Sequence, residues 1–181
     1  WFKYDWIWQK NRPSGHLNAK KMPLKNHEII SIFYNKPCNY NPIKTKAPEH
    51  LIDKRKTINN GKIKDGSYIN GSKSFEDIRV KDNGLRYPKT IQQFKAERGL
   101  HPTQKPLELL KYLVKTYTNE NDWVLDNTCG SNTTGIACYD LNRNYIGIEK
   151  DVNIYKVAKK RVEENILLRA NKPKTLFEQW P

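Results

Sequence analysis

Two acidic residues, each closing a short apolar run, are the strongest candidates for binding a ligand. Asp126 follows Val-Leu and leads into a turn of small residues that reaches Gly135, and Glu149 follows Ile-Gly-Ile, 23 positions after Asp126. Open parallel sheets bind ligands at the carboxyl ends of their strands, and an acid about 20 residues past a glycine-containing turn suits hydrogen bonds to both hydroxyls of a ribose. An ordinary turn whose glycine serves only the chain geometry is an equally weighted alternative.

The composition of the turn narrows the class of ligand. Residues 127–134 read Asn-Thr-Cys-Gly-Ser-Asn-Thr-Thr. A phosphate-binding loop needs several glycines or a Gly-Lys-Ser/Thr ending, and the turn has neither. The G-x-G-x-x-G pattern of NAD-dependent oxidoreductases is also missing. The turn therefore favours a ligand with a sugar and a base but no pyrophosphate, which points to S-adenosylmethionine rather than NAD or ATP.

A strand–helix–strand pattern after residue 100 is expected to position these residues. Strands are predicted at 122–126 and 144–149, and helices from Pro106, from Thr133 to about Leu141, and over 151–170. The first helix is indicated by proline at its start and by apolar residues that fall on one helical face. The residues of that face are Leu107, Leu110, Val114 and Tyr117. The alternation predicts an α/β protein with a parallel sheet.

The front of the chain predicts two more strands, at 3–9 and 28–34. The near-continuous apolar run of the second predicts burial on both faces. Tyr4, Trp6 and Trp8 are candidates either for the core or for stacking on bases. From about 36 to 100 no period of 2 or 3.6 survives for long, which is typical of a functional or disordered loop region.

The charge balance favours a polyanionic partner. The chain has 33 Lys and Arg against 19 Asp and Glu, a net charge of +14. Such an excess steers association with nucleic-acid phosphates, although a merely basic, soluble protein is the alternative. The three cysteines, Cys38, Cys129 and Cys138, are odd in number and irregularly spaced, so we expect reduced thiols and neither a disulfide framework nor a metal site. No apolar run approaches the ~18 residues of a membrane span.

Several motifs in a fixed order resemble one enzyme family. The string HPTQKP at 101–106 precedes the acid-ended strand and turn, and IGIE follows at 146–149. This order is similar to that of the β-group of bacterial and phage DNA amino-methyltransferases, which act on N6 of adenine or N4 of cytosine. WIWQKN at 6–11 and the strand opening with His27-Glu28 resemble the two strands before that family's target-recognition segment.

The resemblance implies a fold and a division of the chain. The implied fold is the Rossmann-like α/β fold of S-adenosylmethionine-dependent methyltransferases, circularly permuted and incomplete at the N-terminus. Residues 1–36 would be part of the catalytic domain, 37–100 the loop-rich target-recognition region, 101–170 the cofactor-binding part and 171–181 a tail.

The resemblance also implies site residues. S-adenosylmethionine would be held by the HPTQKP segment, the turn and the next strand end. These residues are His101, Thr103, Gln104, Lys105, Asp126, Thr128, Cys129, Gly130, Asn132, Thr133 and Glu149. A basic stretch near the front would contact DNA phosphates, or would simply be solvated. Its residues are Arg12, Lys20, Lys21 and Lys25.

The chain departs from the family pattern at two places in the turn, and it also lacks the family's catalytic motif. Asn132 replaces the usual second glycine, and Asn127-Thr128 replace Pro-Phe. Asparagine tolerates positive φ better than most residues, so the turn can survive, and whether its side chain crowds the cofactor is left open. The catalytic Asp/Asn/Ser-Pro-Pro-aromatic motif does not occur in the chain. We therefore expect no catalytic residue here, a motif upstream of Trp1, and no activity of residues 1–181 alone.

The expected function is transfer of a methyl group to an exocyclic base amine of double-stranded DNA, with N6-adenine favoured. The setting would be restriction-modification or phage DNA protection, in the cytoplasm of a bacterial or phage-infected cell. A cognate restriction endonuclease is a further candidate partner, and neither a membrane nor a metal is expected. The alternative is a non-catalytic DNA-binding remnant of such an enzyme.

Overall fold

The structure is a computed structural model that describes residues 1–52, 83–97 and 104–170. The chain divides into two compact units, one made of residues 1–41 and 89–181 and the other of residues 42–88. All the elements that form the candidate site belong to the first unit.

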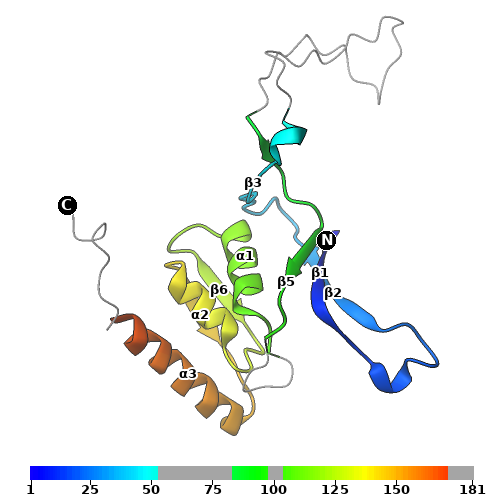
Figure 1. The fold of residues 1–181 in the computed structure, drawn as a ribbon. Coiled ribbons are helices and arrows are strands. Elements are labelled where there is room, and N and C mark those ends of the chain that lie inside the picture. Colours follow the sequence, from blue (N-terminus) through cyan, green and yellow to red (C-terminus); the bar gives the residue numbers. More distant parts are fainter. Residues whose placement is uncertain (53–82, 98–103, 171–181) are drawn as a thin grey trace, which may run out of the picture. The chain divides into compact units, whose positions relative to one another are not determined.

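The first unit contains a three-stranded sheet in the order β2-β1-β5. Strand β1 (Phe2–Ser14) pairs antiparallel with β2 (Lys25–Phe33), and the short 3-10 helix η1 (His16–Asn18) lies in the turn between them. Figure 1 shows this hairpin projecting away from the helices. Strand β5 (Ile91–Phe94) runs parallel to β1, with Ile7 opposite Ile91.

The prediction that the second strand is buried on both faces was wrong. Exposure alternates along β2, and Ile29 is 61% and Phe33 63% exposed. The buried face of the sheet carries Trp6 and Trp8 on β1, so among the described residues only one face is covered. The apolar run therefore reflects a β-branched strand sequence and not two packed faces.

Helix α1 (Leu107–Tyr117) packs on two sides. Toward the sheet, the ring centroids of Trp6 and Tyr112 lie 5.7 Å apart, and the Trp6 indole donates a hydrogen bond of 2.5 Å to the hydroxyl of Tyr117. Toward the other side, Val114 joins a buried cluster with Ala137 and Cys138. The predicted apolar face is confirmed for Leu107, Leu110 and Val114, which all belong to this cluster, and Trp6 and Trp8 are core residues.

The predicted strand–helix–strand order follows α1. Strand β6 (Trp123–Asp126), helix α2 (Thr133–Asp140), strand β7 (Asn144–Gly147) and helix α3 (Val152–Ala170) succeed one another. Strands β6 and β7 pair in parallel, with Asp126 opposite Gly147. The carboxyl ends of both strands therefore meet at one edge, as the sequence predicted.

The second unit contains a small two-stranded sheet. Strand β3 (Thr45–Lys46) pairs antiparallel with β4 (Leu85–Arg86), and the 3-10 helix η2 (Glu49–Leu51) follows β3. The Arg86 guanidinium donates a hydrogen bond of 2.9 Å to the carbonyl of Leu51. This unit lies within the stretch 37–100 that lacks periodicity, whereas β5, from the same stretch, belongs to the sheet of the first unit.

Candidate cofactor site

A cavity of about 220 Å³ opens at the carboxyl end of β6. Its walls come from the segment before α1, from α1 itself, from the loop of residues 127–132 and from the start of α2. The lining residues are Gln104, Lys105, Leu110, Asp126, Thr128, Cys129, Gly130, Ser131, Thr133 and Thr134. Seven of the predicted cofactor residues are in this set, so the structure brings most of them together around one space.

Asp126 holds the 127–132 loop against helix α2. One carboxylate oxygen accepts a hydrogen bond of 3.2 Å from the backbone N–H of Thr128, and the other accepts one of 2.6 Å from the hydroxyl of Thr134. A carboxylate near the first turn of a helix is also favoured by the helix dipole. Asp126 therefore both lines the cavity and fixes the loop that surrounds it.

Glu149 braces the same loop from the end of β7. Its carboxylate accepts hydrogen bonds from the backbone N–H groups of Gly130, at 3.0 Å, and Asp151, at 2.9 Å. The backbone N–H of Cys129 donates to the carbonyl of Ile148 at 3.0 Å. Glu149 is not one of the residues that line the cavity, but it lies immediately behind Gly130, which does.

Asn132 keeps the turn geometry of the glycine that it replaces. Its φ is 60° and its ψ 39°, in the left-handed region, directly before α2. The side chain lies against Gly135 and does not line the cavity. A Cβ at Gly135 would also come within 2.8 Å of the Tyr145 ring. Because Gly135 has no side chain, Asn132 and Tyr145 can pack there and the cavity stays open.

The HPTQKP segment reaches the cavity through Gln104 and Lys105. The ammonium of Lys105 lies 2.8 Å from Glu28 of β2, and Glu28 also binds Lys10 at 2.5 Å. Both lysines lie over the ring of Trp8, at 5.9 and 5.2 Å from its centroid. Burial alone would raise the pKa of Glu28, but hydrogen bonds and charge from the two lysines outweigh it and lower that pKa. This cluster joins the hairpin sheet to the cavity wall.

Cys129 is a thiol in the wall of the cavity. Burial raises its pKa, and the carboxylates of Asp126 and Glu149 raise it further. The thiol is therefore protonated and weakly nucleophilic near neutral pH. Burial also raises the pKa of Cys138, to about 11. Cys38 is exposed, so the three thiols differ in accessibility.

Arg161 of α3 is a contributor that sequence reasoning missed. Its guanidinium donates hydrogen bonds to the carbonyl of Ser131, at 2.8 Å, and to the hydroxyl of Thr133, at 2.9 Å. Little in the sequence singles out Arg161, because the helix 152–170 contains several basic residues and its pattern does not distinguish Arg161 from the others.

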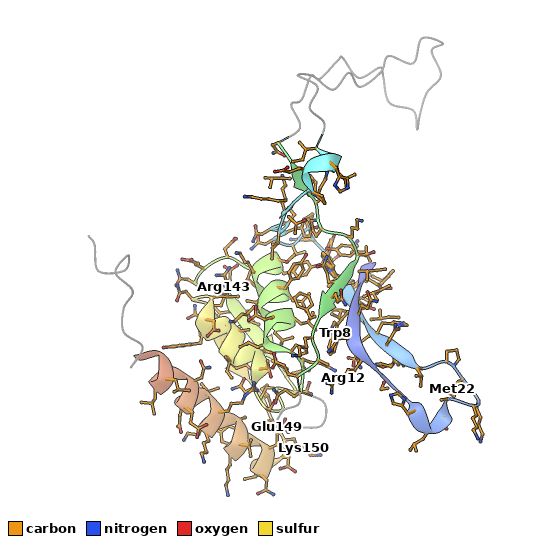
Figure 2. All side chains as sticks on the ribbon, viewed as in Figure 1. Trp8, Arg12, Met22, Arg143, Glu149 and Lys150 are labelled. Carbon is orange, nitrogen blue, oxygen red and sulfur yellow. The ribbon has the colours of Figure 1, made fainter. Side chains whose placement is uncertain are left out.

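The remaining predicted residues lie elsewhere. His101 and Thr103 fall outside the described residues. The predicted phosphate contacts all lie on the projecting hairpin and are exposed; they are Arg12, Lys20, Lys21 and Lys25. Figure 2 shows Met22 near the outer end of this hairpin, well apart from Glu149.

No group of three or more His, Cys, Asp or Glu residues within 1–52, 83–97 and 104–170 could hold a metal ion. In the same part of the chain, no helix has the length and apolar character needed to cross a membrane.

The chain is similar to known proteins. The N6_N4_Mtase family model, described as DNA methylase, matches residues 1–160. The type II methyltransferase M2.MboI of Moraxella bovis is 41% identical over 96 residues, which are 53% of this chain and 33% of the relative. The DNA adenine methyltransferase YhdJ of Escherichia coli (strain K12) is 32% identical over 158 residues, 83% of this chain and 49% of the relative.

A solved structure is also similar. The crystal structure of the M1.HpyAVI-SAM complex matches with a TM-score of 0.54 and 28% identity, over 89% of this chain and 62% of that one. The chain spans at most about half the length of the curated relatives described above. The predicted family resemblance and mixed α/β fold are confirmed, while the circular permutation stays a prediction. The chain belongs to the DNA methylase family.

Proposed function

We propose that the cavity at the end of β6 binds S-adenosylmethionine. We further propose that the chain belongs to an enzyme that transfers its methyl group to an exocyclic amine of DNA, with N6-adenine favoured over N4-cytosine. The observation that carries the proposal is the convergence of the β6 carboxyl end, the 127–132 loop and the HPTQKP segment on one cavity, in a chain of the DNA methylase family.

The lining residues fit this ligand better than a nucleoside triphosphate. Lys105 is the one cation among the described lining residues, and Asp126 is a carboxylate among the same residues. A triphosphate would bring several negative charges against that pair, which is unfavourable at short range. S-adenosylmethionine brings a sulfonium, an ammonium and a single carboxylate. A Cβ at Gly130 would meet nothing within 4 Å, so the loop leaves open space where the cofactor would approach.

The bound cofactor would supply a methyl group on a sulfonium, which is a good leaving group. The residues of this chain would bind and orient it. Asp126 and Glu149 would hold the loop in place. The family pattern assigns the ribose hydroxyls to Glu149, although it lies behind Gly130 in this structure, and Gln104, Lys105, Thr128 and Thr133 would close the walls. His101, Thr103, Cys129, Gly130 and Asn132 complete the set proposed from the family motifs. With reactants held in line, positioning supplies much of the rate enhancement.

DNA would contact the exposed hairpin, whose cations can neutralise phosphates without reading sequence. A base inside a duplex must be flipped out to reach an enzymatic pocket. We assign residues 1–36 to part of the catalytic domain and residues 37–100 to the loop-rich target-recognition region. Residues 101–170 are assigned to the cofactor-binding part of the catalytic domain, and 171–181 to a tail. A restriction-modification or phage-protection setting in the cytoplasm, with a cognate endonuclease, belongs to the same proposal.

Cofactor binding can be tested with the thiols of the chain itself. Alkylation of each cysteine with iodoacetamide, followed by peptide mass spectrometry, should show that S-adenosylmethionine slows the reaction of Cys129 at least about tenfold at saturation. Cys38, which is exposed, is the internal control and should react at an unchanged rate. Equal rates at Cys129 with and without cofactor would refute the site.

Methyl transfer and base identity require a second assay. Tritium from labelled S-adenosylmethionine should enter duplex DNA of mixed sequence. After digestion to nucleosides, the label should be found in N6-methyladenine and not in N4-methylcytosine if N6-adenine is the target. The alternative, a non-catalytic DNA-binding remnant, is favoured by one observation: no Pro-Pro-aromatic string occurs in the 181 residues. That alternative predicts salt-dependent DNA binding with no label in any nucleoside.

A further inference from the structure

Arg161 joins helix α3 to the cavity wall through buried hydroxyl groups. Ser131 and Thr133 are each only 4% exposed, and they flank the left-handed residue Asn132. The same guanidinium nitrogen of Arg161 contacts the carbonyl of Ser131, at 2.8 Å, its hydroxyl, at 3.2 Å, and the hydroxyl of Thr133, at 2.9 Å. Both ends of the left-handed turn are therefore tied to one side chain.

The contacts of Arg161 extend to the opposite wall. The hydroxyl of Ser131 donates a hydrogen bond of 3.3 Å to the side-chain oxygen of Gln104. Ser131, Thr133 and Gln104 all line the cavity, whereas Arg161 does not. A chain of hydrogen bonds thus runs from α3 through the 127–132 loop to the segment before α1.

The position of Arg161 on α3 suits this role. Ala158, one helical turn earlier, is 2% exposed, so the small side chain lets α3 approach α2 closely. All three of its described hydrogen bonds go to neutral oxygens rather than to a carboxylate. Burial lowers the pKa of Arg161, yet an arginine stays cationic in proteins. The charge of Glu97 partly offsets the effect of burial on Arg161. The hydrogen bonds to Ser131 and Thr133 are therefore what argues for a specific role of this side chain.

We propose that Arg161 is a positioning residue for the cofactor: it holds Ser131 and Thr133, and through Ser131 Gln104, in the arrangement that receives S-adenosylmethionine. The inference rests on the proposed cofactor site. The competing explanation is that Arg161 serves only to dock α3 and stabilise the fold as a whole.

The three cysteines separate these explanations without any ligand. In Arg161→Ala, alkylation of Cys129 in the loop should accelerate at least threefold, while the fully buried Cys138 stays protected and the exposed Cys38 is unchanged. Parallel acceleration of Cys138 would reveal general loosening and overturn the proposal, as would an unchanged Cys129. Lys160→Ala is the matched control, because that side chain is 78% exposed on the same helix.

Cofactor affinity provides the second measurement. Calorimetry should show that Arg161→Ala binds S-adenosylmethionine about tenfold more weakly. Added ethylguanidinium should restore most of the lost affinity, a result that a merely structural role of Arg161 does not predict. If Arg161→Ala does not fold, Thr133→Val removes one acceptor at equal size and should give the same pattern to a smaller degree. Failure of the unaltered protein to bind cofactor would refute the proposed function, while the alkylation rates would still decide the role of Arg161.

Discussion

Replacing Glu28 with glutamine should destabilise the protein although the residue lies on a strand outside the cavity. Glu28 accepts from Lys10 at 2.5 Å and from Lys105 at 2.8 Å, and the two ammonium groups share the face of Trp8. Glutamine keeps the size and one acceptor oxygen but removes the charge. The variant leaves the two lysines without the carboxylate that they share.

The magnitude follows from the exposure of the two pairs. The Lys10 side chain is 16% and Glu28 29% exposed, so this pair belongs near the lower end of the ~1.5–3 kcal/mol measured for hydrogen bonds to charged groups. Lys105 is 44% exposed, and solvent screening reduces such a pair to roughly 0–1 kcal/mol. We expect a loss of about 2 kcal/mol, which for a chain of this size lowers Tm by about 4–8 °C.

The effect should also depend on pH. The pKa of Glu28 is lowered in the folded protein, so its stabilisation is present above the pKa of the unfolded chain, about 4.3, and is lost as pH falls through the folded value. The difference in stability between the natural protein and Glu28→Gln should therefore be constant above about pH 5 and shrink in more acidic buffer.

Thermal unfolding followed by circular dichroism between pH 3 and 8 checks this reasoning. Glu163→Gln is the matched control, because Glu163 and its partner Lys159 are 59% and 62% exposed and 3.9 Å apart. The control should change stability by less than about 0.5 kcal/mol. If the two variants behave alike, or if the Glu28→Gln difference does not shrink at all between pH 5 and pH 3, the lysine cluster does not stabilise the fold as described.

Three further outcomes are expected. Glu149→Ala should weaken S-adenosylmethionine binding at least tenfold, about 1.4 kcal/mol, by calorimetry, and unchanged affinity would remove Glu149 from the site. Asn132→Gly should leave the stability to chemical denaturation within about 0.5 kcal/mol, whereas Asn132→Ala should cost about 1 kcal/mol or more because alanine resists positive φ; equal effects would contradict the turn geometry. DNA affinity, measured by fluorescence anisotropy, should fall by orders of magnitude between about 50 and 200 mM salt. An affinity that does not change with salt would show that the net charge of +14 does not contribute to DNA binding.

The sequence predicted the cofactor half of the fold well because its signals are local. Residues 122–126 and 144–149 are apolar runs closed by acids, and the structure has strands at Trp123–Asp126 and Asn144–Gly147. The helix predicted from Thr133 to about Leu141 spans Thr133–Asp140. A short apolar run next to a glycine-containing turn can be recognised as a strand from its own residues, without knowing its partners in the fold. The helices can be recognised in the same way from the period of their apolar residues.

What could not be predicted depended on distant partners. Strand β5 has only four residues, Ile91–Phe94, and is a strand because it pairs with β1, more than 80 positions earlier. Burial of the 28–34 run was misjudged because the number of covered faces depends on the neighbours of a strand, which its own sequence does not contain. The role of Arg161 could not be predicted for the same reason: its partners lie about 30 positions away and are ordinary hydroxyl and carbonyl groups.

The departure at Asn132 shows how a site can change its residues and keep its geometry. The left-handed conformation that glycine would supply is taken by asparagine, one of the few residues that adopts it readily. The added side chain needs space, and that space exists because Gly135, one helical turn away, has no Cβ. Asn132 therefore packs toward α2 and Tyr145 while Gly130, Ser131 and Thr133 face the cavity. The glycine that accommodates Asn132 is Gly135, so the turn can carry asparagine at position 132 and still border the cavity at the end of β6.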